Sequence, residues 1–167
     1  MDVLARAVNS ALFVSHGIRE GSHVLLHLMG GEGPSRRIWF NGSNLGGVRP
    51  DERSISGQIK AILKESVPPR GQFIEYSSGI LHSGGDIEQT LEEWSSMGIC
   101  PVILDADGDE FSDLPTSIDL GFIISDDMPL TEHDTQSLQS PVNLSLGSRW
   151  LQGHSCIAIL HYLLDGD

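Results

Sequence analysis

Hydrophobic residues recur every three or four positions in three segments of the chain, as they do in helices that pack one face on a core. These segments are residues 2–16, 53–66 and 86–97. Gly17 follows the first segment and Val67-Pro68-Pro69 follows the second, and residues of these types commonly end helices. The pattern predicts three amphipathic helices over these ranges.

Short runs rich in β-forming residues lie between and after the helical segments. Runs 24–29 and 37–40 flank a glycine-rich turn and predict a hairpin at a sheet edge, and residues 73–81 predict two short strand fragments. Three further runs are hydrophobic enough for buried strands: residues 101–104, 121–125 and 142–146. Because strands and helices alternate, the chain is predicted to have an α/β fold.

The last of these strands leads into a turn and a hydrophobic helix. Val142, Leu144 and Leu146 alternate as in a strand, Gly147 permits a sharp turn, and a hydrophobic helix runs from Ile157 to the end. Proteins of the α/β class bind ligands where a loop joins the carboxyl end of a strand to a helix. An ordinary turn without a ligand would have the same pattern, so both interpretations stay open.

Length and composition indicate the size of the fold and the cellular environment of the protein. A chain of 167 residues can bury a substantial core, and we expect one domain over residues 1–167. The two cysteines, Cys100 and Cys156, form no CxxC pair, and no hydrophobic run is as long as a membrane span. These features predict a protein of the reducing cytoplasm with no membrane contact.

Charge is distributed unevenly along the chain. The formal net charge is −13, which by itself disfavours a nucleic-acid partner. Residues 1–70, however, hold nine of the ten basic residues and six acidic ones, a balance of +3, whereas the remainder carries −16. The first part is therefore expected to face RNA while the acidic part stays solvated. A generally acidic surface, as in salt-adapted proteins, explains the acidity equally well.

Metal and hydrolase chemistry find little support. His23 and His27 lie in a β-type run without the glutamate of a zinc-binding helix, and the acidic run 105–110 has its glycine at the wrong position for a calcium loop. No serine lies in a GxSxG motif. We expect no metal site, and an exposed acidic loop at 105–110.

Blocks at both ends of the chain resemble those of a known family. The blocks are residues 1–6, 15–19, 50–54, 122–126, 145–147, 151–157 and 161–165. In this order they are similar to the archaeal tRNA pseudouridine N1-methyltransferases of the SPOUT superfamily, over essentially all 167 residues. The resemblance implies S-adenosylmethionine as methyl donor and pseudouridine 54, in the T loop of tRNA, as acceptor.

The resemblance also implies a fold. Members of the family have an open, mainly parallel α/β sheet flanked by helices, with a C-terminal trefoil knot, and they usually form homodimers. A strand normally precedes the first helix. Here Met1 stands where that helix begins, so the start is mis-assigned, the chain is trimmed, or the sheet lacks this strand.

The cofactor residues are inferred from the same resemblance. The adenosine is expected among backbone groups, so that loop shape matters more than side-chain charge. For Cys156 we expect packing in this pocket and no nucleophilic role. The family commonly has Ser-Asp-His where this chain has Ser-Asp-Asp at 125–127. The expected cofactor residues are Ile124, Ser125, Gly147, Trp150, Leu151 and Cys156.

The resemblance further suggests catalytic residues at the starts of two helices. Asp2 and Arg6 open the first helix, where the acceptor base is expected to approach across a subunit interface and Asp2 to accept or orient the N1 proton. Arg53, in the first turn of the second helix, is expected to meet the RNA or the target nucleoside. The alternatives are that Asp2 is a helix N-cap and that Arg53 forms a salt bridge to Asp51 or Glu52.

Two other functions remain open on the sequence. One is a SPOUT methyltransferase acting on ribosomal RNA, for which a more basic surface is expected. The other is a non-catalytic RNA- or nucleotide-binding module, suggested by the absent first strand and by Asp127.

Overall fold

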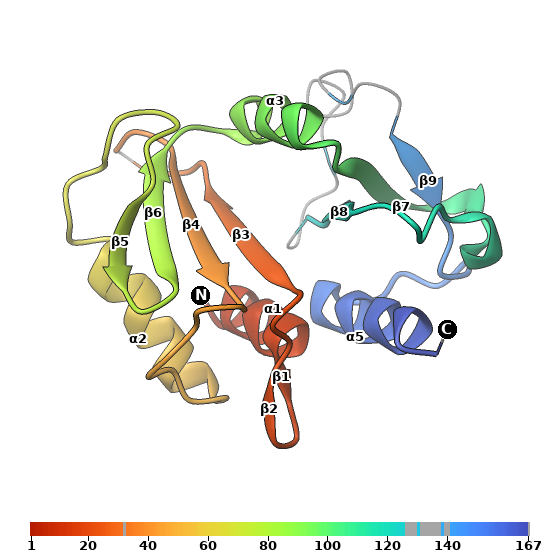
Figure 1. The fold of residues 1–167 in the computed structure, drawn as a ribbon, viewed down its shortest axis with the longest axis horizontal. Helices are drawn as coiled ribbons and strands as arrows, with labels where there is room; N and C mark the ends of the chain where they lie inside the picture. The colour runs from red at the N-terminus through yellow and green to blue at the C-terminus, as the bar shows by residue number, and fades with distance from the viewer. Residues whose placement is uncertain (32, 126–129, 131–137, 139–140, 167) are drawn as a thin grey trace. The chain divides into compact units, whose positions relative to one another are not determined.

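The structure is a computed structural model that describes residues 1–31, 33–125, 130, 138 and 141–166 (Figure 1). Contacts between residues divide the chain into two compact units. Unit 1 covers Met1–Asp86 and unit 2 covers Ile87–Asp167.

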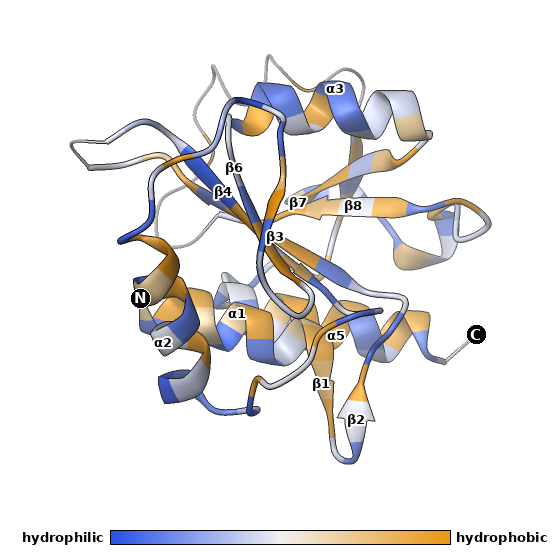
Figure 2. Cartoon of the chain, turned by 60° about the vertical axis from the view of Figure 1, so that its left-hand side comes forward, coloured by the Kyte–Doolittle hydropathy of each residue, from blue (hydrophilic) through white to orange (hydrophobic). Residues whose placement is uncertain are grey.

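Unit 1 is built on a four-stranded sheet. The sheet order is β3-β4-β6-β5, and each neighbouring pair is antiparallel. Helices α1 and α2 pack against each other on one side of this sheet (Figures 1 and 2). The elements of unit 1 are α1 (Asp2–Leu12), β1 (Phe13–Val14), β2 (Gly17–Ile18), β3 (His23–Leu28), β4 (Arg36–Asn41), α2 (Glu52–Ile62), β5 (Ile74–Ser77) and β6 (Ile80–Gly84).

The core of unit 1 follows the helical and strand periodicities. The buried face of α1 and that of α2 each repeat at helical spacing, and β4 and β6 are mostly buried. Asp51 begins α2, because its side chain accepts a hydrogen bond from the Ser54 amide at 2.8 Å. The fully buried hydrophobic residues of unit 1 are Ala5, Val8, Leu12, Ile38, Phe40, Ile55, Ile59, Ile62 and Ile80.

A buried arginine ties the sheet to the end of α2. The Arg36 guanidinium donates hydrogen bonds to the carbonyl oxygens of Ile62 and Glu65. The last carbonyls of a helix lack partners within the helix and carry partial negative charge, so a cation is favoured there. Burial lowers the pKa of Arg36. The contact fixes the carboxyl end of α2 against β4.

Unit 2 is built on a three-stranded parallel sheet of order β8-β7-β9. Figure 2 shows β8 and the first half of β7 as largely hydrophobic, as expected of strands in a parallel sheet, whereas residues 105–109 of β7 are largely polar and mostly exposed. The elements of unit 2 in its described residues are α3 (Ile87–Met97), β7 (Cys100–Asp109), the short 3-10 helix η1 (Phe111–Asp113), β8 (Leu120–Ile123), β9 (Val142–Leu144) and α5 (Gly153–Leu164).

The core of unit 2 joins the sheet to α5 and α3. Val102, Leu144 and Leu160 are among its buried hydrophobic residues. On β8, Gly121 leaves room for the Trp94 ring of α3, since a Cβ at Gly121 would lie 2.2 Å from Trp94 Cζ3. Trp94, which the helical spacing of residues 86–97 predicts to be a core residue, thus packs on Gly121.

Most predicted elements are confirmed, with corrections at the ends of three helices. The three helices, the hairpin and the later strands form where the pattern placed them. The first helix ends at Leu12 instead of residue 16, because the chain turns there into the small hairpin in which Phe13 pairs with Ile18. The second helix ends at Ile62 instead of residue 66, and the C-terminal helix begins at Gly153 instead of Ile157.

The prediction of a mainly parallel sheet holds for unit 2 and is wrong for unit 1. Strands β5 and β6 are joined by Ser78-Gly79 alone, and β3 and β4 by one loop at residues 29–35. Connections this short allow only antiparallel pairing, whereas a parallel pair needs a long crossover.

The expected loop at 105–110 is also wrong, because β7 continues through Asp109. Its backbone approaches β9 so closely that a Cβ at Gly108 would lie 2.7 Å from the Asn143 carbonyl carbon. The sequence also predicts a weak helix that Thr131 caps, before Pro141. Most of that segment, together with Asp126 and Asp127, lies outside the described residues. Among the helices that the structure describes, none combines the length and hydrophobicity needed to cross a bilayer.

His82 on β6 is buried beside charged groups. Its side chain is 5% exposed, and its Nδ1 atom has no hydrogen-bond partner among the described residues. Burial lowers the pKa of His82 from its ordinary 6.5, the Arg36 charge lowers it further, and Glu65 partly offsets both. The folded chain therefore favours neutral His82.

Stability is expected to fall as the pH drops below about 6.5, because the unfolded chain then binds a proton that folded His82 resists. Replacing His82 by Gln removes this titration, so the free energy of unfolding should change less between pH 7 and pH 5 than in the wild type. Urea unfolding at several pH values measures the difference. Parallel pH profiles for the two chains would contradict the prediction.

Candidate functional site

Two loops of unit 2 begin at the same edge of the parallel sheet. Strand β8 ends opposite Ile103 of the central strand β7, and β9 pairs opposite Leu104, one residue further along. Because both strands run parallel to β7, their carboxyl ends meet at one edge. The residues that follow them, Ile124-Ser125 and Ser145–Gly147, start from neighbouring positions. This edge is where α/β proteins place ligands.

Ser145 holds the second loop in place. Its hydroxyl donates a hydrogen bond to the Ala106 carbonyl at 3.0 Å and accepts one from the Gly147 amide at 3.1 Å. Its own amide donates to the Asp109 carbonyl at 2.8 Å. The end of β9 is thereby fixed to the extension of β7.

Gly147 adopts a conformation that side chains rarely take. Its φ is +98°, and a Cβ placed there would meet no atom within 4 Å. The backbone at this turn is therefore open on one side, as the sequence predicts for close approach of a ligand.

The start of α5 packs on the first loop. A Cβ at Gly153 would lie 3.2 Å from Ile124 Cγ2 and 3.5 Å from the Ser125 carbonyl oxygen. No side chain caps α5 among the described residues. Backbone amides at a helix start favour a group that accepts hydrogen bonds.

The remaining predicted cofactor residues lie at this helix start. The buried Cys156 has its Sγ atom 4.0 Å from the Leu151 carbonyl oxygen, and burial raises the pKa of its thiol. A neutral thiol is a poor nucleophile, so this observation agrees with a packing role. Leu151 is 40% exposed and Trp150 is 91% exposed. Trp150 thus contributes little to the core of unit 2.

The chemistry of this edge suits an adenosine group. A planar base needs hydrophobic contact on its faces and hydrogen bonds at its edges. Hydrophobic contact is available from Ile124, Leu151 and Cys156. Hydrogen-bonding groups are available from the open backbone at Gly147 and from the carbonyl of Ser125. The residues present therefore fit the cofactor that the resemblance implies.

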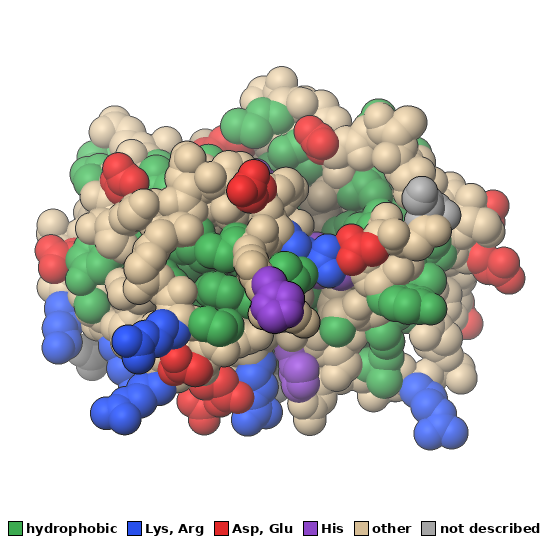
Figure 3. All heavy atoms as spheres, turned by 60° about the horizontal axis from the view of Figure 1, so that its bottom comes forward, with side chains coloured by type: hydrophobic (Ala, Val, Ile, Leu, Met, Phe, Trp, Pro, Cys, Tyr) green, Lys and Arg blue, Asp and Glu red, His purple; other side chains and the backbone are tan. Residues whose placement is uncertain are grey.

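A second set of predicted residues lies at the starts of α1 and α2 in unit 1. The Arg6 Nε atom donates to Glu52 Oε1 at 2.9 Å, and this bond together with the Glu52 charge raises the pKa of Arg6. Asp2, one turn before Arg6, adds to the same effect. Figure 3 views this side of unit 1, where Lys and Arg side chains lie next to acidic ones. The ion pair joins the first turns of the two helices.

The structure decides between some of the alternatives for these residues. Met1 is at the N-cap position of α1 and Asp2 is the first helical residue, so Asp2 is not the cap. Asp51 caps α2 and Glu52 binds Arg6. Arg53 forms no ion pair within the part of the chain that is described, so the salt bridge considered for it is not found. Its exposed side chain stays available to a partner.

The predicted residues thus fall into two groups. Asp2, Arg6 and Arg53 belong to unit 1, and all six predicted cofactor residues belong to unit 2. Within the described ranges no cluster of three His, Cys, Asp or Glu side chains is placed to hold a metal ion.

Sequence reasoning missed three residues of these sites: Glu52, Ser145 and Gly153. The partner of Arg6 and the hydrogen bonds of Ser145 depend on pairing between distant segments, for which the sequence gives no local signal. For Gly153 the sequence does carry a signal, although a weak one. A glycine at the start of a hydrophobic helix indicates that another segment packs closely there.

Comparison with known proteins gives one family over the whole chain. The sequence model of a family described as "Putative SAM-dependent RNA methyltransferase" matches residues 1–167. A tRNA (pseudouridine(54)-N(1))-methyltransferase of Methanosarcina mazei is 34% identical over 99% of this chain and 78% of its own length. A protein of the same name from Haloarcula marismortui is 33% identical over 99% of this chain and 82% of its own length.

A solved structure shares the fold. The crystal structure of Archaeoglobus fulgidus Nep1 bound to S-adenosylhomocysteine matches with a TM-score of 0.69. The match covers 99% of this chain and 69% of that one, at 14% sequence identity. At this identity the likeness shows the fold alone.

Replacing Ser145 by Ala should loosen the turn after β9, because two hydrogen bonds are lost. We expect the free energy of unfolding to fall by about 1 kcal/mol and the Gly147 amide to exchange faster with solvent. Urea unfolding and hydrogen exchange measure these effects. Ser148→Ala, which removes an exposed hydroxyl three residues away, is the matched control. Equal behaviour of the two variants would contradict the role given to Ser145.

Proposed function

The chain belongs to the family of SAM-dependent RNA methyltransferases, and we propose that it transfers a methyl group from S-adenosylmethionine to N1 of pseudouridine 54 in tRNA. The observation that carries the proposal is the end-to-end similarity to proteins named for this reaction. The open backbone at the carboxyl edge of the parallel sheet supports it, since a nucleoside-containing cofactor fits there.

We assign the cofactor to the loops of unit 2. Its adenosine contacts the backbone of Ile124, Ser125 and Gly147, and the hydrophobic side chains at the start of α5 pack on the base. S-adenosylmethionine supplies a methyl group that its sulfonium already activates. The chain therefore has to orient the donor and exclude water, which is a task for loop shape.

The acceptor requires removal of one proton. As the bond between sulfur and methyl breaks, the bond between N1 and methyl forms, and the N1 proton must pass to a base. Asp2 is the proposed acceptor of this proton, and Arg6, held by Glu52, keeps a cation beside it. Arg53, exposed and without an ion-pair partner among the described residues, is assigned to a phosphate of the RNA.

Three further properties belong to the proposal. They are a trefoil knot formed by the C-terminal segment, a homodimer in which one subunit's α1 approaches the partner's cofactor loops, and action on tRNA in the cytoplasm. The exposed side chains of Tyr162 and Trp150 give α5 and its preceding loop a hydrophobic surface that suits a partner subunit.

The proposal is tested with two tRNA transcripts that differ only in having pseudouridine or uridine at position 54. N1 of uridine carries the ribose, whereas N1 of pseudouridine carries a proton and can be methylated. We expect one methyl group from labelled S-adenosylmethionine per pseudouridine transcript and none on the uridine transcript. Nuclease digestion and mass spectrometry should locate it. Equal labelling, or none on either transcript, would refute the proposal.

The same assay tests the proton acceptor. Asp2→Asn keeps the size of the side chain but removes its basicity, so kcat should fall about a hundredfold while the affinity for S-adenosylmethionine is kept. Unchanged kcat would remove Asp2 from the mechanism.

A further inference from the structure

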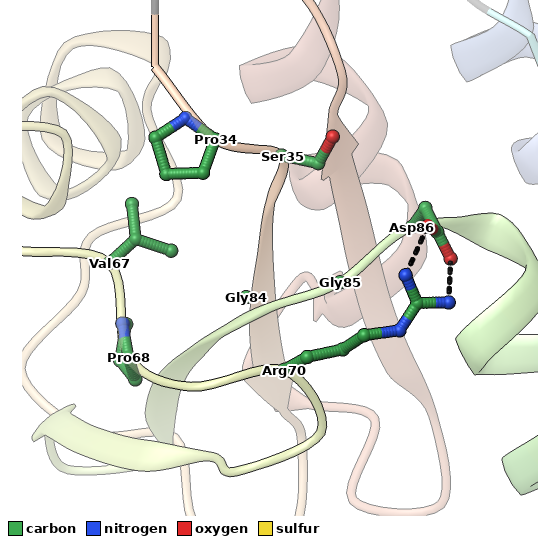
Figure 4. Close-up of a pocket in the computed structure, with 8 residues that line it drawn as sticks. All are labelled: Pro34, Ser35, Val67, Pro68, Arg70, Gly84, Gly85 and Asp86. Atoms are coloured by element: carbon green, nitrogen blue, oxygen red, sulfur yellow. Dashed lines mark hydrogen bonds and ion pairs between the residues drawn. The ribbon is translucent and has the colours of Figure 1, made fainter.

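Unit 1 has a groove that the reaction does not use. It has a volume of about 360 Å³ and is lined on one side by Pro34, Val67 and Pro68. Arg70 and Asp86 form its other end (Figure 4). Hydrophobic walls with a few polar groups at one end are typical of small-molecule and nucleotide sites.

Backbone contacts fix the shape of the groove. The Gly84 amide donates to the Pro68 carbonyl at 3.0 Å, and the Gly71 amide donates to the Gly84 carbonyl at 3.2 Å. A Cβ at Gly84 would lie 2.7 Å from the Pro68 oxygen, so a larger residue does not fit. Gly85 has a φ of +125°, which other residues rarely adopt. The segment with the two prolines is therefore fixed against the end of β6.

The arginine at the polar end is oriented but accessible. Its two terminal nitrogens contact the two Asp86 carboxylate oxygens at 2.7 and 2.9 Å. The Arg70 side chain is nevertheless 53% exposed, whereas that of Asp86 is 23% exposed. Asp86 thus holds the guanidinium at the rim by binding both terminal nitrogens, and the exposed part of this cation attracts a phosphate from the solvent side.

Charge favours RNA as the occupant. Unit 1 holds nine basic and eight acidic residues, whereas unit 2 holds one basic and fifteen acidic residues. The negative charge of unit 2 therefore repels a polyanion such as RNA, whereas the nearly balanced charge of unit 1 does not. Proline and valine side chains accept the flat face of a base, which a folded duplex does not offer and an unpaired nucleotide does.

We infer that the groove binds one unpaired nucleotide of the tRNA, with its base against Pro34, Val67 and Pro68 and its phosphate against Arg70. This inference rests on the proposed function. The nucleotide is a different one from the reacting pseudouridine, because the residues assigned to that base lie on α1 and α2. The groove thus adds affinity and register for the substrate without touching the transferred methyl group.

Two variants separate the base contact from the phosphate contact. Arg70→Ala should raise the Kd for labelled tRNA about fivefold near 100 mM salt, and should lower the slope of log Kd against log salt by about one. Val67→Asn should remove the hydrophobic contact with the base and raise Kd by about threefold with the slope unchanged, because it removes no charge. Fluorescence anisotropy at several salt concentrations measures both.

Controls distinguish the groove from a general loss of charge or of folding. Lys60→Ala removes one exposed positive charge elsewhere on unit 1 and should change Kd by less than about twofold. Arg70→Lys should recover part of the affinity. Each variant should keep the wild-type melting temperature within a few degrees, the wild-type affinity for S-adenosylhomocysteine and the wild-type kcat, and only KM for tRNA should rise.

The possible outcomes separate the two proposals. If the wild type binds and methylates tRNA but the groove variants keep its Kd and KM, the groove inference is wrong and the proposed function stands. If the wild type binds tRNA through the groove but transfers no methyl group, only the proposed function fails. A wild type that does not bind tRNA refutes both.

Discussion

The parallel pairing of β8 and β9 with the central strand β7 is the constraint on which the candidate cofactor site depends. Parallel neighbours have the same direction, so the segments after both outer strands start at one edge of the sheet. Ser145 fixes one of these segments to β7, and the close approach of Gly153 to Ile124 fixes the other to α5. Residues about twenty positions apart in sequence thus form one surface with open backbone.

Unit 1 depends on a different constraint, which is the burial of charged and polar groups within its antiparallel sheet. Arg36 binds the Ile62 carbonyl at the end of α2 and the Glu65 carbonyl just beyond it, and the neutral His82 lies beside Arg36. If one partner of a buried hydrogen bond is removed, the other partner is left buried without a hydrogen bond. The resulting loss of stability is larger than the net contribution of the hydrogen bond. The arrangement holds α2 on the sheet and so fixes the position of Arg53 and of the Arg6–Glu52 pair.

Much of this organisation can be predicted from the sequence, because it rests on local patterns. The three helices and the turn at Gly147 follow from periodicity and from glycine chemistry, and the family resemblance is confirmed by the match over residues 1–167. The prediction of a mainly parallel sheet is wrong for unit 1, although the pattern does predict its hairpin. The sequence of a hairpin does not say which other strands it pairs with.

Local sequence patterns also fail to predict contacts between segments that are distant in the sequence. The acidic run 105–110 has the composition of a loop, yet Asp109 pairs with Leu144 and continues β7. Tertiary pairing there outweighs the low strand propensity of aspartate. For Arg53, the sequence cannot decide between a partner molecule and a salt bridge with its neighbours, since Glu52 binds Arg6, which lies 46 positions away.

The most direct test of the account is a calorimetric titration with S-adenosylmethionine of the wild type, Gly147→Trp and Gly31→Trp. Both glycines have similar φ values, +98° and +102°, and open space where a Cβ would lie, so the two substitutions impose similar backbone strain. If the turn after β9 holds the cofactor, the wild type and Gly31→Trp should bind saturably. Gly147→Trp, which fills this turn, should bind at least about tenfold more weakly. Equal affinity of all three chains, or no binding to a folded wild type, would contradict this placement of the cofactor.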